Sequence, residues 1–442
     1  MNKSYKFVYN NPVGYYKGFT LIELLAIIVI LAIIAVITVP LILGIIDDAK
    51  LNSITASAYG YKSAIQNYSM YLQTADSNST GIKGSYTVDE LRTLGLEVKG
   101  QEPDSGIILV DNEGISGCLK YDEYASFIYN NKVINTTKGN CPIEKLVTTG
   151  DGLYKSDIEP GKLIYRGQNP NNYIILNEGP TSSPSNVTYR IVSYEPDGTV
   201  KVVRNVTIGA KTWDTANTRK SDGTDNTFCT EQYGCNVWGC GSNTLHNGNL
   251  LGDSFNYMYY PSASAATLTN GLSGKVGSDS TLNTYLNSKT NNSTNSWQPA
   301  IVLDQYIDNH LWNVGGIYNI ADDKGIIKEK EEERQLQWIG KIALLNISEF
   351  AETSTNPNCV SVKYGSSSAC PCKESNWTFK TYNQWSLSSY SSGSRYVWFV
   401  SSVGSFNSYS ASNSVAVHPA FYLKSGLSLN GSGVIGDEYQ IN

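Results

Sequence analysis

The longest apolar run in the chain extends from Leu24 to Ile46 and is interrupted only mildly, by Thr38, Pro40 and Gly44. A helix of this length, at ~1.5 Å per residue, spans roughly 35 Å, which is enough for the hydrocarbon core of a bilayer. Lysines precede the run, and no acidic residue comes before Glu23. This asymmetry predicts a single-pass cell membrane protein with a cytoplasmic N-terminus and extracellular C-terminal domains.

Two residues are expected to weaken this helix locally. Pro40 has no backbone N–H, and its ring clashes with the carbonyl group of Val36. Gly44 follows one turn later and adds flexibility. We therefore expect a helix kink or a local opening at Pro40 and Gly44.

The helical pattern continues beyond the apolar run. A partial stripe at helical spacing is formed by Leu51, Ile54, Ala58, Ile65 and Tyr68. We therefore expect the helix to continue to residue 72 and to carry a globular head on this second half.

Short alternating segments after the helix predict a small antiparallel head. Thr87 and Glu90 have the spacing of a capping box, which predicts a short helix over 88–94. Turn residues at Asp111–Gly114 and Asn130–Asn131 separate predicted strands. We place these strands at 106–110, 117–121, 124–129 and 132–134.

The rest of the chain predicts short strands joined by long irregular connections. The segments 189–194 and 199–204 alternate apolar and polar residues on either side of Glu195–Gly198, a hairpin turn. A short helix is predicted over 280–286 and a long polar loop over 401–414. Further strands are predicted at 339–345, 396–400 and 420–423.

Composition separates a second domain from the first head. All 8 tryptophans lie after residue 212, and a polar stretch occurs near residue 150. The predicted fold class is α+β: a long N-terminal transmembrane helix with a small antiparallel β head, followed by a larger β-rich α+β domain. The predicted parts are a leader (1–18), a transmembrane helix (19–46), the rest of the first domain (47–146), a linker (147–160) and an extracellular β-rich module (161–442).

Charge and motif content exclude several classes of function. Lys plus Arg number 33 against 39 Asp plus Glu, so a broad basic surface is disfavoured and no nucleic acid is expected on the head. The 3 histidines leave little room for a His-rich metal site or a general base. Serine-hydrolase, phosphate-loop and zinc-protease motifs are missing. We expect no enzymatic activity, no cofactor and no metal, although the two carboxylates of a glycosidase need no local spacing.

The 8 cysteines, in a region expected outside the cell, are disulfide candidates. Cys118 and Cys141 lie in the first head and are expected to close a loop. The other six allow several pairings, and a zinc site is the alternative, although their spacing contains no CxxC pair. They are Cys229, Cys235, Cys240, Cys359, Cys370 and Cys372.

The residues just before the apolar run have the form of a processing signal. Gly18-Phe19-Thr20-Leu21-Ile22-Glu23 leads directly into the predicted helix. A carboxylate within a membrane helix costs about 2.5–3.5 kcal/mol on insertion scales, so Glu23 needs a partner. An α-amino group at Phe19, created by cleavage after Gly18, could neutralise Glu23 on a neighbouring subunit and fix the register of packed helices.

From Lys17 to Ala49 the sequence resembles the prepilin cleavage and methylation signature of type IV pilins and pseudopilins. The resemblance implies cutting between Gly18 and Phe19 by a prepilin peptidase and N-methylation of Phe19. It also implies a role for Glu23 in subunit docking. The alternative, a plain membrane anchor with a chance glutamate, explains neither Gly18 nor the placement of Glu23.

The second domain resembles extracellular modules appended to prepilin-like proteins of Gram-positive bacteria. The resemblance lies in residues 189–192, 282–287 and 338–345 and in the ending, which consists of 396–398 and 417–423. That ending also resembles C-type-lectin-like and formylglycine-generating-enzyme-like folds, with His418 where an arginine is expected. Glu195-Pro196-Asp197 is similar to the calcium- and sugar-binding triplets of C-type lectins, but its place in a hairpin favours a plain turn.

Aromatic residues in loops are the first place to look for a ligand. We would look at 236–241 and 390–409, although most tryptophans are expected in the core. The mixed charges at 324–334 are expected to be solvated.

Together these features predict a type IV pilin-like surface protein, assembled through its helix into a pilus or pseudopilus and displaying an adhesion or recognition head. Its partners would be the prepilin peptidase, the pilus assembly machinery, other pilin subunits, the membrane and a carbohydrate or protein surface ligand. The alternatives are a pseudopilin of a type II-like secretion or DNA-uptake machine and a membrane-tethered extracellular enzyme.

Overall fold

A computed structural model gives the fold of the chain. It describes residues 20–441 except 77–78, 80, 111–113, 140, 142–145, 158, 160–161, 180–182, 196, 216–235, 240–242, 247–248, 251–278, 289–296, 298–300, 315, 318–335, 357–358, 360–372, 391–394, 426 and 428. The chain divides into two compact units, Met1–Ser53 and Ile54–Asn442. Each is described by itself below.

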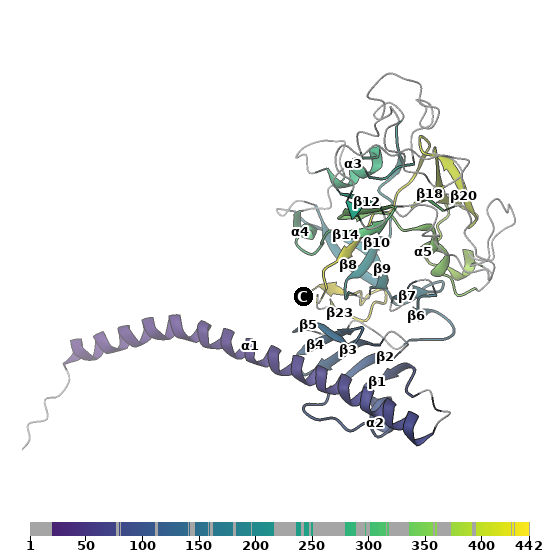
Figure 1. Cartoon of the computed structure of the whole chain (residues 1–442). Coiled ribbons are helices and arrows are strands. Elements are labelled where there is room, and N and C mark those ends of the chain that lie inside the picture. Colours follow the sequence, from purple (N-terminus) through teal and green to yellow (C-terminus); the bar gives the residue numbers. More distant parts are fainter. Residues whose placement is uncertain are drawn as a thin grey trace, which may run out of the picture. The chain divides into compact units, whose positions relative to one another are not determined.

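The first unit consists of the N-terminal part of helix α1 (Leu21–Ala75), the longest element of the protein (Figure 1). The backbone of α1 is helical at Pro40 and Gly44. The kink or local opening expected there stays a prediction. Thr38 Oγ1 donates to the carbonyl oxygen of Ile34 at 2.8 Å, a contact that a helix accommodates. No helix in the described part of the chain is long and apolar enough to cross a membrane.

The second half of α1 carries the small antiparallel head predicted from the sequence. Its stripe is buried at Ile54, Ala58 and Ile65, together with Tyr61. The strands β1 (Gly84–Thr87), β2 (Ser105–Val110), β3 (Ile115–Tyr121), β4 (Tyr124–Tyr129) and β5 (Lys132–Lys138) form one sheet in sequence order, every pair antiparallel.

Helix α2 (Val88–Thr93) confirms the predicted capping box. The hydroxyl of Thr87 accepts from the backbone of Glu90 at 3.1 Å, and the Glu90 carboxylate accepts from the backbone of Thr87 at 2.8 Å. The Asn130–Asn131 turn is also confirmed, since both residues adopt positive φ, as asparagine tolerates. β1 was not predicted, because its glycine, serine, tyrosine and threonine lack an apolar alternation.

The larger domain is built on a seven-stranded sheet. Its order is β17 (Ile342–Ala343), β22 (Ala420–Leu423), β10 (Val200–Arg204), β9 (Ser185–Tyr194), β7 (Leu163–Arg166) and β6 (Gly152–Lys155), with β8 (Tyr173–Glu178) also pairing with β9. β9 and β10 confirm the predicted hairpin, with Gly198 at φ +84° in its turn. β6 lies inside the segment 147–160, so part of the predicted linker is sheet.

A second sheet contains six strands. They are β11 (Ala210–Thr212), β21 (Ser414–Ala416), β18 (Gln384–Tyr390), β19 (Tyr396–Val400) and β20 (Phe406–Ser410), with β15 (Gly316–Ile317) pairing with β18. The polar loop predicted over 401–414 is wrong in part, because β20 pairs with β19 along its whole length. β20 is an edge strand, where serine and asparagine side chains remain near water, so its apolar signal is weak.

Smaller elements complete the domain. A four-stranded sheet has the order β13 (Asn249–Leu250), β12 (Thr244–His246), β16 (Leu336–Gly340) and β14 (His310–Asn313), and β23 (Leu429–Asn430) pairs with β24 (Gln440–Ile441). The helices are α3 (Thr281–Asn287), α4 (Ile301–Asp304), α5 (Ile347–Glu352) and the 3-10 helix η3 (Lys373–Ser375). α3 confirms the helix predicted over 280–286, whereas the strand predicted over 339–345 is split between β16 and β17.

The core of the larger domain is aromatic, as expected from the tryptophans. Seven of them are 5% exposed or less: Trp213, Trp238, Trp312, Trp338, Trp377, Trp385 and Trp398. Asn236, Val237 and Trp238 are themselves buried. The described part of the loop proposed as a ligand surface therefore belongs to the core, because its side chains pack against the sheets instead of facing water.

Candidate functional site

The start of α1 is the candidate processing and docking site. Gly18 and Phe19 lie outside the described residues, but Thr20 and Glu23 show how the helix begins. Glu23 Oε2 accepts from the backbone N–H and from the hydroxyl of Thr20, both at 2.9 Å, and the Thr20 hydroxyl accepts from the backbone of Glu23 at 3.3 Å. This is a capping box, in which side chains replace the hydrogen bonds missing at a helix N-terminus. The Thr-x-x-Glu spacing could have revealed it in the sequence.

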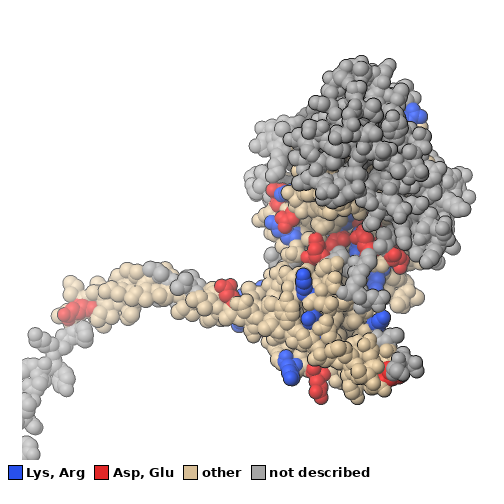
Figure 2. Space-filling view, viewed as in Figure 1, with Lys and Arg blue, Asp and Glu red and all other residues tan. Residues whose placement is uncertain are grey.

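Behind Glu23, α1 presents apolar side chains to its surroundings. Leu24 is 53% exposed, Ile28 55% and Leu31 59%, and the exposure continues to Ile46 at 46%. Along this segment the visible described surface in Figure 2 is almost entirely uncharged between an acidic patch near its start and another further along. Exposed apolar patches of this kind mark sites of contact with other proteins or with lipid.

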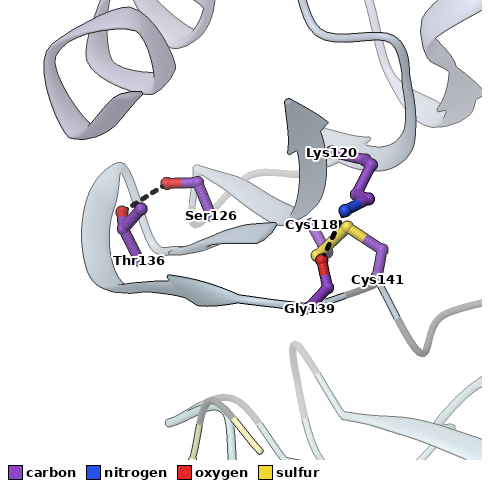
Figure 3. Close-up of a disulfide and its surroundings, with 6 residues drawn as sticks. All are labelled: Cys118, Lys120, Ser126, Thr136, Gly139 and Cys141. Carbon is purple, nitrogen blue, oxygen red and sulfur yellow. Dashed lines mark hydrogen bonds between the residues drawn. A yellow bond between two sulfur atoms is a disulfide. The ribbon is translucent and has the colours of Figure 1, made fainter. Parts of the chain in front are cut away.

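A disulfide ties together the first head, as predicted. Cys118 on β3 and Cys141 have Cα atoms 5.7 Å apart and are joined through their sulfurs (Figure 3). Cys118 is fully buried, and Lys120 Nζ donates to the carbonyl oxygen of Gly139 at 2.6 Å close by. The covalent bond therefore fixes the end of β5 against the centre of the sheet.

Of the remaining six cysteines, the structure describes one, Cys359. Cys359 is buried and disulfide-bonded, which is the state expected for an extracellular domain. Cys229, Cys235, Cys240, Cys370 and Cys372 lie outside the described residues, so their pairing stays a prediction.

The larger domain contains a group of charged side chains that the sequence did not reveal. We call it the buried ion cluster and define it as Lys162, Glu195, Lys201 and Glu349, each less than 10% exposed. Lys201 Nζ lies 2.6 and 2.7 Å from the two carboxylate oxygens of Glu349. Lys162 Nζ lies 3.0 Å from Glu349 and 3.5 Å from Glu195. Two cations and two anions thus share one interior space.

Local structure explains how these side chains become buried. A register shift between Lys201 and Val202 interrupts the regular β9–β10 pairing beside the cluster. The rings of Trp312 and Tyr422 cover Lys201 Nζ at 4.7 and 5.0 Å. Glu349 is the third residue of α5, and its carboxylate also accepts from the backbone of Asn346 at 3.0 Å.

The proton affinities of the cluster follow from these contacts. Burial opposes ionisation of Glu349, but Lys201 and Lys162 outweigh it and bring the pKa of this carboxyl to about 2. Burial raises the pKa of Glu195, although Lys162 opposes that change. Burial alone would lower the pKa of Lys162, but Glu195 and Glu349 raise it above its usual value. The cluster is therefore a network of mutually stabilised charges, and at its edge Lys162 Nζ also lies 3.4 Å from the exposed Glu159.

Hydrogen bonds and an ion pair define the surroundings of Glu195 and Asp197 in the hairpin turn. The Glu195 carboxylate accepts from Ser193 Oγ at 2.5 Å and faces Lys162, so it is turned inward. Asp197 Oδ1 accepts from the backbone and hydroxyl of Thr199 and closes the turn. This arrangement fits the plain turn favoured by the sequence and leaves Glu195 facing a lysine instead of a calcium ion.

His418 occupies a structural position in the ending of the domain. Its Nδ1 lies 2.9 Å from the carbonyl oxygen of Arg204, and its Nε2 lies 3.1 Å from the hydroxyl of Tyr382. Burial, together with the positive charges of Lys380 and Arg204, lowers the pKa of His418 to about 4, although the hydrogen bond to the Arg204 carbonyl opposes this change. The side chain is thus neutral at pH 7 and joins β22 to the end of β10.

Comparison with known proteins identifies the N-terminal segment only. Residues 15–39 match the prokaryotic N-terminal methylation motif, a stretch that includes Gly18, Phe19 and Glu23. No curated protein and no solved structure matches the chain. The motif supports a type IV pilin-like prepilin segment, and it implies processing by a prepilin peptidase and assembly with the pilus machinery and other pilins.

Proposed function

We propose that this protein is a type IV pilin-like surface protein with a recognition head. Prepilin peptidase cuts between Gly18 and Phe19, and the segment 24–46 anchors the protein in the cell membrane before its assembly into a filament. The observation that carries the proposal is the match of residues 15–39 to the methylation motif, directly ahead of exposed apolar side chains on α1.

The large second domain supports a minor or tip subunit. Residues 161–442 form the greater part of the chain, and a module of that size on every subunit would crowd a narrow filament. Its described interior is closed by tryptophans and by the buried ion cluster, which suits a rigid binding head. We propose adhesion or recognition, without enzymatic activity, as its task.

Substitution of Glu23 tests the docking role. Glu23→Gln can still accept the hydrogen bonds of the Thr20 capping box, because glutamine serves at this position as well as glutamate. It cannot neutralise an α-amino group. Glu23→Ala removes both functions.

We expect both variants to insert in the membrane normally and both to be incorporated poorly into filaments, measured as the sheared extracellular fraction. Asp47→Asn, at the other end of the apolar run, is the control and should assemble normally. Normal incorporation of Glu23→Gln would show that capping, and not charge, is the role of Glu23.

A further inference from the structure

Most of the buried and half-buried cations in the described part of the larger domain have a carboxylate in contact. Lys162 and Lys201 contact Glu349, Arg166 lies 3.2 Å from Glu352, and Arg204 lies 2.7 Å from Glu178. This is the expected arrangement, because a charge removed from water without a counter-charge is costly. Arg190 and Lys380 depart from it.

Arg190 is 4% exposed and has only neutral contacts among the described residues. Its Nε donates to Asn172 Oδ1 at 2.5 Å, and its Nη2 donates to the carbonyl oxygen of Pro170 at 3.1 Å. The guanidinium carbon lies 3.7 Å from the centre of the Tyr173 ring and 4.9 Å from that of Trp377. The rings hold the guanidinium plane in place, while Nη1 donates to none of the described groups.

Lys380 is only half-buried, and it is a second cation with no carboxylate in contact among the described residues. Its Nζ donates to Asn205 Oδ1 at 3.3 Å, its one hydrogen bond within the described chain. Burial and the positive charge of Arg190 lower the pKa of Lys380 to about 8. The two cations therefore lie within electrostatic reach of each other and raise each other's energy.

The backbone explains why they come together. Asn205, the partner of Lys380, donates its backbone N–H to the carbonyl oxygen of Thr188 at 3.1 Å. Thr188 lies two residues before Arg190 on β9, so the side chains of Thr188 and Arg190 point to the same face of the sheet. Trp377, which packs on Arg190, lies three residues before Lys380.

The carboxylate of Asp151 acts on Arg190 but does not neutralise the pair. Asp151 raises the pKa of Arg190 somewhat against the effect of burial. Its two oxygens accept from the backbone N–H groups of Gln168 at 2.9 Å and Asn169 at 2.8 Å. Within the described residues it forms no ion pair with Arg190.

We propose that Arg190 and Lys380 form a binding site for a small oxyanion, either a carboxylate or a sulfate group. A guanidinium presents planar donors that match both groups, and an ammonium adds a point charge. The ligand supplies the negative charge that the fold provides to every other buried cation named above. The biological use of this site rests on the proposed recognition role of the head, but the binding itself does not.

The test uses the full-length protein purified in a non-ionic detergent, so it is independent of filament assembly. Sodium acetate, sodium glucuronate and sodium sulfate are titrated at constant ionic strength against sodium chloride. We expect at least one of the three to raise the thermal unfolding midpoint in a saturable way, because a ligand that binds only the folded state stabilises it. Acylation of Lys380, followed by mass spectrometry at pH 8, should slow as the same ligand saturates.

Two variants make the result specific. Lys380→Met should abolish the ligand-induced shift and raise the midpoint without ligand, since it removes the repulsion from Arg190. Lys341→Met is the control, because Lys341 Nζ already lies 2.5 Å from Asp304, and it should keep the full shift. The proposal is overturned if none of the three anions shifts the wild-type midpoint more than chloride does, or if Lys380→Met retains the shift.

Discussion

At the scale of single residues, the larger domain matches most of its interior charges with charges of opposite sign, Arg190 and Lys380 apart. Glu349 is the centre of the buried ion cluster, since both Lys162 and Lys201 contact its carboxylate. Charged residues in alternating strands and in hairpin turns normally face water, which is why the burial of Lys201 and Glu195 could not be predicted from the sequence. Their burial depends on partners elsewhere in the chain, Glu349 of α5 for Lys201 and Lys162 for Glu195.

Replacing Glu349 by glutamine should therefore be severe. Glu349→Gln leaves Lys201 buried without a carboxylate, and loss of one partner from a buried ion pair costs about 3–5 kcal/mol. We expect the free energy of unfolding in urea to fall by that amount. Asp304→Asn, which breaks the half-exposed pair with Lys341, should cost roughly 1 kcal/mol or less. Equal effects of the two substitutions would disprove the structural role of the cluster.

The histidine at the domain ending should make stability depend on pH. The pKa of His418 is about 4 in the folded protein, against an ordinary value of 6.5. Between these values the unfolded chain takes up a proton that the folded chain does not, so stability is full above pH 6.5 and falls as the pH drops towards 4. The loss attributable to His418 is on the order of 3 kcal/mol.

The measurement is urea unfolding of wild type and His418→Gln at several pH values. The variant should be less stable at pH 7. Between pH 6.5 and 4, its unfolding free energy should depend less steeply on pH, by about the contribution of one bound proton. An unchanged slope in the variant would assign the pH dependence to other groups, such as His310, whose pKa is also lowered to about 4 by burial.

At the scale of elements, local signals were sufficient where they were strong. The capping box at Thr87, the β9–β10 hairpin and the strands at 396–400 and 420–423 are confirmed. The sequence failed where tertiary contacts decide. β20 consists largely of serine and asparagine and exists through its pairing with β19, and the run over 339–345 is divided because its two halves join different sheets.

The disulfide of the first head gives a prediction at this scale. Cys118–Cys141 closes a loop of 23 residues in sequence separation that contains β4 and β5. Removing it in Cys118→Ser/Cys141→Ser should destabilise this part of the sheet by roughly 3 kcal/mol, because the unfolded chain gains freedom.

Hydrogen exchange resolved by peptide localises that effect. Exchange of β4 and β5 should accelerate in the double variant, while that of β18 and β19 in the larger domain should not change. A reducing agent should have the same effect on β4 and β5 in the wild type and none in the variant. Identical exchange of β5 in wild type and variant would mean that the disulfide does not limit opening of this sheet.

At the scale of the whole molecule, the processing segment is a short contiguous motif, whereas the proposed oxyanion site is assembled by the fold. The processing segment could be predicted from the sequence because peptidase recognition depends on a short contiguous motif, and residues 15–39 match it. The oxyanion site could not, because Arg190 and Lys380 are brought together by the sheet and by the segment that follows η3. The prepilin-like segment can therefore be predicted from a few neighbouring residues, whereas the proposed binding site of the head requires the three-dimensional structure.

The central claim is that the chain is a processed, membrane-anchored pilin-like subunit. The most direct test is the N-terminal sequence and intact mass of the protein isolated from native membranes. We predict a chain that begins at N-methylated Phe19. A chain that begins at Met1 would contradict the account, because the segment ahead of Glu23 would then serve only as part of an anchor.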